Sequence, residues 1–137
     1  MNIVKAQNSM NSFIGKRFKY GQFDCLVFSI KVLESFHEIS IQLPLKYDGS
    51  RKSIAKLFKR YKAKTLDKLV QNYCLENKWT EVQKNYLQPF DLLILKVKKE
   101  NVFAIWDGEK AMSVCKTGYG VVFDYSFSKA FRIKKGI

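Results

Sequence analysis

The chain has 137 residues, the length of one domain, and its 47% of hydrophobic residues, with 11 Phe and 7 Tyr, predict a folded core and exclude a disordered protein. The net charge is +13, from 25 Lys and Arg against 12 Asp and Glu, and it favours anionic partners. Arg is the residue that usually reads base edges, and Lys outnumbers it here, so we expect no specific recognition of nucleic acid. No apolar run approaches the roughly 20 residues that span a bilayer, and residues 1–10 lack the hydrophobic segment of a secretion signal, so we expect no membrane insertion and synthesis in a cytoplasm.

Four helices are predicted in the first half of the chain. They span about residues 3–13, 25–37 and 51–62, and a fourth begins after Thr65. The second is apolar on nearly every side, which predicts a buried central helix. The third and fourth carry lysines opposite an apolar face, and Ser50 and Thr65 are residue types that cap helices. Residues 39–49, which include Pro44, are predicted to be irregular.

The second half of the chain predicts an antiparallel sheet. Strands are expected over residues 92–97, 102–106, 111–116, 121–123 and 130–134. Asp107-Gly108 favours a tight hairpin turn, and residues 117–120, with two glycines, are predicted to form another turn. Helices followed by an antiparallel sheet give the fold class α+β, which we expect as a single domain over residues 1–137.

The cysteines and the single histidine limit the possible cofactors. Cys25, Cys74 and Cys115 lie far apart and form no CxxC pair, so free thiols are expected. With only His37 to add to them, a structural zinc site is not expected. The chain also has no glycine-rich phosphate loop. We therefore predict no metal and no other cofactor.

Cys25 is the candidate for chemistry. Asp24 is a strong N-cap residue type, so Cys25 is expected at the first position of a helix, after a chain turn at Gly21. There the helix dipole and the unpaired amides lower a thiol pKa and can hold an oxyanion. The alternative is that Cys25 is a small buried residue of a core helix. The local pattern leaves both interpretations open.

A nucleophilic thiol also needs a base, and His37 is badly placed to be one. It follows Cys25 by twelve residues on the same predicted helix, which separates the two by roughly 18 Å and turns them about 120° apart. We expect His37 to be a helix-end residue instead, where a cation suits the carbonyl end of the dipole.

Several segments resemble the NlpC-type cell-wall peptidases, which are compact papain-like proteins. The segment from Phe18 to Phe28, with Tyr20-Gly21 and then Asp24-Cys25, resembles their nucleophile motif. Pro89-Phe90-Asp91 is similar to their Pro-Gly-Asp turn, with Phe90 in place of the glycine, and residues 102–108 are similar to their next strand and turn. The resemblance implies N-terminal helices around a Cys-bearing core helix, packed on a C-terminal antiparallel sheet.

The resemblance is closer to a short branch of that superfamily found in tailed phages. This branch has a Tyr-x-Gly/Ser segment, here Tyr47-Asp48-Gly49-Ser50, and ends with a glycine turn and an aromatic-Arg strand, here Phe131-Arg132. Active peptidases carry a base histidine at the start of the second strand, where this chain has Val102, or Asn101 if the alignment slips by one. Ser113 falls near the third polar residue of the family.

The resemblance thus implies a site at Cys25, Asp24, Tyr20 and Ser113, with its base missing. Three functions remain open at this stage. The first is a structural component of a phage tail, at the tip or hub, with a degenerate papain-like fold, other tail proteins as partners and the virion as its location. The second is a cysteine hydrolase or amidase that acts on host peptidoglycan with a base from another subunit or a group other than histidine. The third is a basic adaptor for nucleic acid or an anionic cell envelope.

Overall fold

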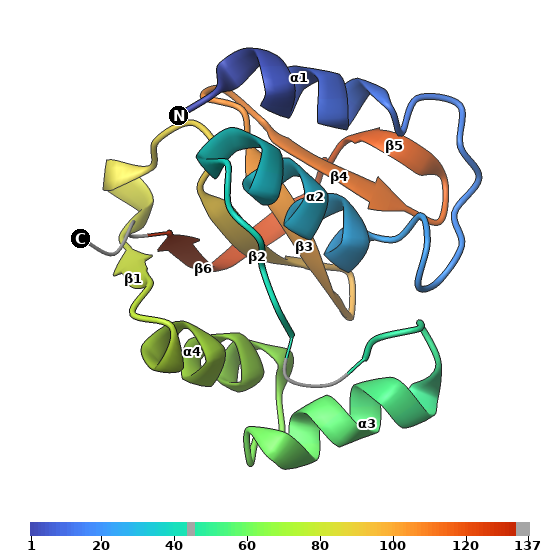
Figure 1. Ribbon diagram of the computed structural model, residues 1–137, viewed down its shortest axis with the longest axis vertical. Coiled ribbons are helices and arrows are strands. Elements are labelled where there is room, and N and C mark those ends of the chain that lie inside the picture. Colours follow the sequence, from blue (N-terminus) through green and yellow to red (C-terminus); the bar gives the residue numbers. More distant parts are fainter. Residues whose placement is uncertain (44–45, 134–137) are drawn as a thin grey trace.

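The computed structural model describes residues 1–43 and 46–133, and the fold of these residues is α+β (Figure 1). Within those ranges four helices come first: α1 (Ile3–Asn11), α2 (Cys25–His37), α3 (Arg51–Arg60) and α4 (Leu66–Glu76). Six strands follow: β1 (Thr80–Val82), β2 (Leu92–Val97), β3 (Glu100–Trp106), β4 (Ala111–Cys115), β5 (Gly118–Val121) and β6 (Tyr125–Arg132). They form one antiparallel sheet in the order β1-β6-β2-β3-β4-β5.

Side-chain caps fix where the helices begin. The side chains of Asp24, Ser50 and Thr65 each accept the backbone N–H of the residue three positions further on, which confirms the predicted starts of α2, α3 and α4. The bounds of α2 are those predicted, and α1 and α3 end two residues earlier than expected. After α3 the chain turns at Lys62, whose φ of 51° lies in the left-handed region and does not continue a helix.

The sheet differs from the prediction in its last third. The turn lies at Lys116-Thr117, and the two glycines predicted to turn are strand residues of β5, in which Gly118 pairs with Cys115. The last strand, β6, begins at Tyr125 and is much longer than residues 130–134. Lys134, like Pro44, lies outside the described residues. The edge strand β1 was not predicted, whereas β2 and the turn at Asp107 are confirmed.

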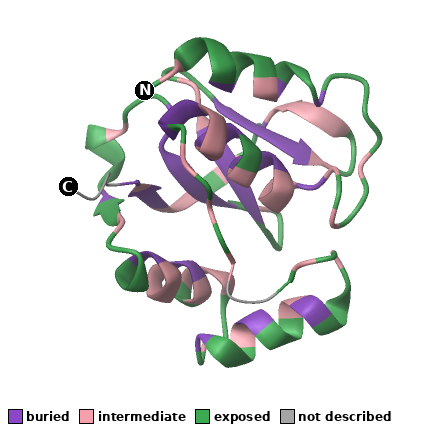
Figure 2. Cartoon of the chain, viewed as in Figure 1, coloured by how far each residue is buried: buried purple, intermediate pink, exposed green. Residues whose placement is uncertain are grey.

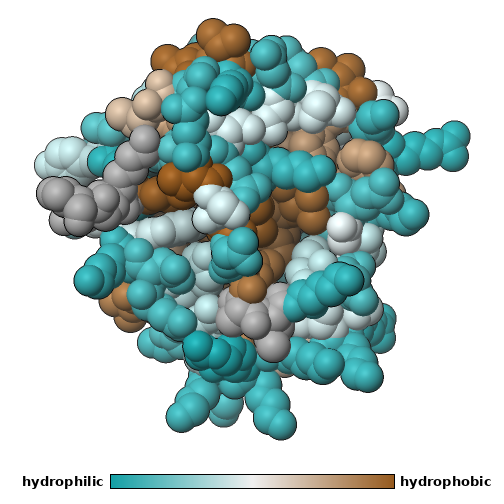
Figure 3. All heavy atoms as spheres, viewed as in Figure 1, coloured by the Kyte–Doolittle hydropathy of each residue, from teal (hydrophilic) through white to brown (hydrophobic). Residues whose placement is uncertain are grey.

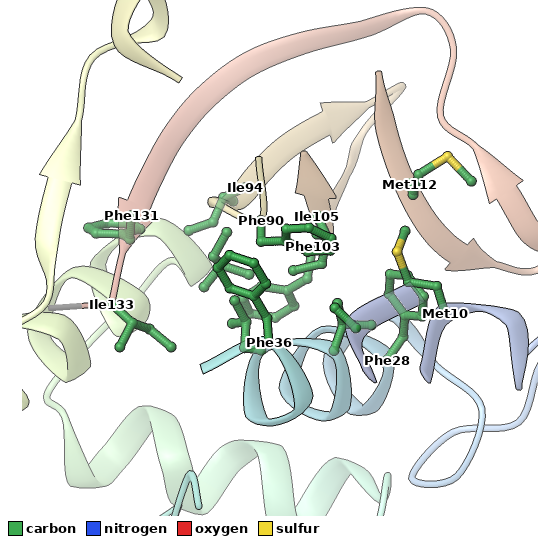
Figure 4. Packing of buried hydrophobic residues seen from close by; sticks show 14 of the residues in the cluster. Met10, Phe28, Phe36, Phe90, Ile94, Phe103, Ile105, Met112, Phe131 and Ile133 are labelled. Atoms are coloured by element: carbon green, nitrogen blue, oxygen red, sulfur yellow. The ribbon is translucent and has the colours of Figure 1, made fainter. Parts of the chain in front are cut away.

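The main core lies between α2 and one face of the sheet. Phe28, Val32 and Phe36 of α2 are buried against apolar side chains of the middle strands and of β6 (Figure 4). Phe36 stacks on Phe90, with 4.3 Å between the ring centroids. Figure 2 shows the burial concentrated in α2 and the central strands. The prediction of a buried central helix is confirmed for this face of α2.

The helices α3 and α4 lie to one side of the body formed by α1, α2 and the sheet (Figure 1). Contacts with β1 and β6 hold α4, and an ion pair from Arg60 to Glu76 joins α3 to α4. No helix in residues 1–43 or 46–133 combines the length and hydrophobicity that a membrane span requires. The space between α3, α4 and α2 is where the candidate site lies.

Candidate functional site

Asp24 holds the start of α2 in place. Its side chain is buried, with 2% of the residue exposed. Its Oδ1 accepts the N–H of Val27 at 2.8 Å, and its Oδ2 accepts the N–H of Gly21 and the O–H of Tyr47, both at 2.6 Å. Three hydrogen bonds to one buried carboxylate make Asp24 a structural anchor for the turn that presents Cys25.

Cys25 is the first residue of α2, as predicted, but its thiol is not activated. The residue is half-buried and free of any disulfide, and its sulfur is surrounded by protein. Burial raises the pKa of the Cys25 thiol from 9.0 to about 12; a hydrogen bond from the backbone of Phe103 opposes the rise and the Asp24 carboxylate adds to it. Of the two interpretations left open by the sequence, the raised pKa favours a buried thiol over one activated by the helix N-terminus, because desolvation of the thiolate outweighs the dipole.

His37 is the last residue of α2, at the opposite end of the helix from Cys25. The prediction that it is a helix-end residue is confirmed. Its ring is buried and meets Phe36 edge-on, with 4.8 Å between centroids. His37 therefore cannot reach the proton of the Cys25 thiol.

Of the two β3 residues that the resemblance offers for the position of the base, Asn101 faces the cavity and Val102 does not. Successive residues of a strand point to opposite faces. On β3, Asn101 and Phe103 line the same cavity as Cys25, whereas Val102 does not. An amide cannot take a proton from a thiol at neutral pH, so Asn101 is no base. The one carboxylate among the described residues that line the cavity, Asp24, is held by three hydrogen bonds.

The remaining predicted residues fall in two places. Tyr20 is 56% exposed, lies edge-on against Phe18 and lines the cavity together with Asp24 and Cys25. Ser113 is buried outside that cavity, and its Oγ donates a 2.5 Å hydrogen bond to the carbonyl of Phe103. Ser113 thus links β3 and β4 beyond the last pair of their backbone register.

The cavity has a volume of about 240 Å³ and is almost entirely apolar. Helices α2, α3 and α4 contribute aliphatic and aromatic walls, among them Leu26, Ile30, Leu33, Ile54, Leu57 and Leu69. Cys25 and Ser29, one turn apart on α2, both line the cavity. Figure 3 shows apolar atoms in a hollow near the centre of one face of the molecule, surrounded by hydrophilic side chains.

Tyr47 and Gly49 belong to the site, although the sequence did not single them out as site residues. The O–H of Tyr47 binds Asp24 across 23 residues of chain, and burial together with the Asp24 carboxylate raises the pKa of Tyr47. Gly49 packs against the backbone of Tyr20 and Gly21. The two segments that carried the resemblance to the phage branch are therefore in direct contact. The two motifs were visible in the sequence, but the contact between them depends on the tertiary fold.

The turn before β2 has a second buried carboxylate. Asp91, 2% exposed, accepts two hydrogen bonds from the guanidinium of Arg132, at 2.8 and 2.9 Å, and one from the N–H of Gln88. This bidentate pair raises the pKa of Arg132. Phe90, between Pro89 and Asp91, has a φ of 70°, a conformation that favours glycine.

Alkylation measures the state of Cys25. With a pKa of about 12 the thiol should react with iodoacetamide at pH 7.5 about a thousandfold more slowly than a thiol with the ordinary pKa of 9.0, because the thiolate is the nucleophile. The measurement is the labelling rate of the Cys25 peptide by mass spectrometry from pH 7 to 10, with Cys25→Ala to assign the peptide. A rate that reaches half its maximum at or below pH 8.5 would contradict the buried, unactivated thiol.

In the described ranges no group of three His, Cys, Asp or Glu side chains is arranged to hold a metal ion. Comparison with curated proteins gives no significant match. A family model, described as a domain of unknown function, DUF6950, matches residues 4–133, which is nearly the whole chain. The chain therefore belongs to the DUF6950 family.

Proposed function

We propose that the chain is a catalytically inactive, NlpC-type papain-like domain that serves as a structural component of a phage tail, at the tip or hub. The observation that carries the loss of activity is the state of Cys25. Its thiol has a pKa raised to about 12, no histidine lines the cavity among the described residues, and the neighbouring carboxylate, Asp24, is held by three hydrogen bonds. A thiol that is neither ionised nor paired with a base is a poor nucleophile at neutral pH.

Two observations support the papain-like part of the proposal. A cysteine begins the central helix, and that helix packs on an antiparallel sheet, which is the arrangement that the resemblance implies. Phe90 stands where the NlpC-type turn has glycine, and its positive φ is the backbone conformation that a glycine at that position would provide. Phe90 also stacks on Phe36 of the same central helix, so the side chain that replaces the glycine has become part of the core.

The tail role rests on the match of motifs to the phage branch. Tyr47-Asp48-Gly49-Ser50 and the segment from Tyr20 to Cys25 both resemble that branch, and they are held together by the hydrogen bond from Tyr47 to Asp24. A half-buried tyrosine and a buried carboxylate preserve the shape of the turn without any need for catalysis. Such a domain suits a role in which the fold is kept for assembly and the chemistry is lost.

Two measurements test this function. Mass spectrometry of intact particles, from the phage whose genome encodes the chain, should find the protein at a fixed ratio to the tail proteins, and antibody labelling in electron micrographs should place it at the tail tip. Purified peptidoglycan should release no fragments with the protein. Absence from the particles would contradict the tail role. Release of fragments that disappears in Cys25→Ala would contradict the loss of activity and favour the hydrolase.

A further inference from the structure

We propose that the cavity between α2, α3 and α4 binds an acyl chain with a neutral carbonyl head group, such as an ester or an amide. The hydrocarbon lies along the apolar walls, and the carbonyl lies at the end formed by Cys25 and Ser29. Binding is non-covalent. This inference goes beyond the proposed tail function and does not depend on it.

The size and lining of the cavity call for hydrocarbon. Its volume of about 240 Å³ exceeds that of dry apolar cavities, about 150 Å³, that take up benzene. The walls are aliphatic side chains of three helices and aromatic side chains such as Phe58 and Trp79. Water in such a space finds few hydrogen-bond partners, whereas a flexible chain gains contact along its whole length.

Ser29 gives the cavity a polar end that lacks a partner. The residue is 1% exposed and lines the cavity, and its Oγ has no hydrogen-bond partner among the described residues. A buried hydroxyl is normally satisfied, so one without a partner in the wall of a cavity points to a ligand acceptor. The Cys25 thiol, protonated at neutral pH, lies one helical turn away and is a second, weaker donor.

The charges around this end favour a neutral acceptor over an anion. Of the described residues that line the cavity, Asp24 is the only one with a charged side chain. Its carboxylate is already held by three hydrogen bonds and lies next to Cys25. A ligand carboxylate would have to lose its water without a cation to replace it, and it would be repelled by Asp24. An ester or amide carbonyl accepts hydrogen bonds without that cost.

Trp79 allows the occupied cavity to be detected directly. It lines the cavity, whereas the other tryptophan, Trp106, packs with the second apolar cluster. The probe is monododecanoylglycerol with bromine on its chain, used below its critical micelle concentration, because bromine quenches tryptophan fluorescence at contact distance. We expect saturable quenching of the native protein and none of Trp79→Phe, which retains Trp106. Absence of saturable quenching, or equal quenching of both proteins, would overturn the proposal.

The assignment of the head group is tested in two ways, by changing the head group of the ligand and by substituting Ser29. Dodecanoate at pH 8 should compete about tenfold more weakly than unbrominated monododecanoylglycerol. Ser29→Ala should weaken binding of the acylglycerol about three- to tenfold, through the lost hydrogen bond. The matched control is Ser35→Ala, on the same helix but outside this cavity, which should leave the affinity unchanged. Equal affinity for the two ligands, or equal effects of the two substitutions, would overturn the assignment of the head group.

The position of the chain is tested by filling the cavity. Ile54 of α3 lines the cavity, and Ile3 of α1 is 64% exposed. Ile54→Trp should reduce the acylglycerol affinity at least tenfold, and Ile3→Trp, the control for the same change in size, should not. Vesicles of phosphatidylglycerol with brominated chains distinguish a free ligand from a membrane. Quenching by the vesicles without quenching by the acylglycerol would overturn the proposal in favour of a lipid surface.

Discussion

Alanine at Gly21 or at Gly49 should destabilise the protein by about 3 kcal/mol or more, one of the two largest effects that we expect. The φ angles are 81° at Gly21 and 87° at Gly49, in the left-handed region, where a side chain costs roughly 1–2 kcal/mol. A Cβ atom on Gly21 would also lie less than 3.0 Å from the carbonyl of Asp48, and one on Gly49 would lie equally close to the backbone of Tyr20 and Gly21. Either substitution therefore forces two backbones apart.

The measurement is the free energy of unfolding from urea titrations of Gly21→Ala, Gly49→Ala and the control Gly15→Ala. Gly15 has a similar φ of 75°, but a Cβ atom there would meet nothing within 4 Å. The control therefore isolates the conformational cost, and we expect it to lose only about 1 kcal/mol. If all three variants lost the same amount, the close approach of the two segments would be contradicted.

Local signals predicted the parts of the fold that depend on nearby residues. Asp24 precedes a long apolar run, and the cap and the bounds of α2 follow from that pattern alone. The hairpin at Asp107 has the same origin, because its side chain accepts the N–H groups of Glu109 and Lys110, two and three residues further along the chain.

The end of the sheet could not be predicted from such signals. Gly118 and Gly120 are typical of turns, yet they lie in β5, because the two-residue turn at Lys116-Thr117 leaves them in register with β4. The first half of β6 alternates aromatic residues with serines and pairs with β2 alone, with a register shift opposite Ile94 and Leu95, whereas its second half lies between β2 and β1. Pairing between distant strands decides this region, and a single strand pattern does not show it.

The sequence predicted that the candidate site lies at the start of α2, but it did not predict the pKa of the thiol there. Cys25, Asp24 and Tyr20 line one cavity as the motif indicates, and the absence of a base at the β3 position follows from Asn101. The raised pKa of the thiol depends on burial by segments far away in the sequence, which the helix start cannot reveal. Ser113 does not line this cavity, and a strand alignment alone does not say which side chains reach it.

Asp24→Ala should cost about 4 kcal/mol, the other large effect. Two backbone N–H groups and the O–H of Tyr47 would lose their acceptor in a buried place, and each such loss costs about 1–3 kcal/mol. Asp24→Asn, which keeps the shape and one oxygen, should cost about half as much. The measurement is again the free energy of unfolding from urea titrations. The control is Asp107→Ala, which removes a carboxylate that also accepts two N–H groups but in an exposed turn, and which should cost about 1 kcal/mol.

A double-mutant cycle with Tyr47→Phe separates two roles of Asp24, which caps the start of α2 and accepts the hydrogen bond from Tyr47. Alone, Tyr47→Phe should cost about 1–2 kcal/mol, because it removes a hydrogen bond to a charged group. In the Asp24→Ala background it should cost almost nothing, or even restore some stability, since the stranded hydroxyl is removed. Additive costs would show that the 2.6 Å contact between Tyr47 and Asp24 does not hold the two segments together. A coupling of 1 kcal/mol or more would mean that the buried carboxylate acts as an anchor between residues 20–25 and 47–50, whether or not Cys25 has any chemistry.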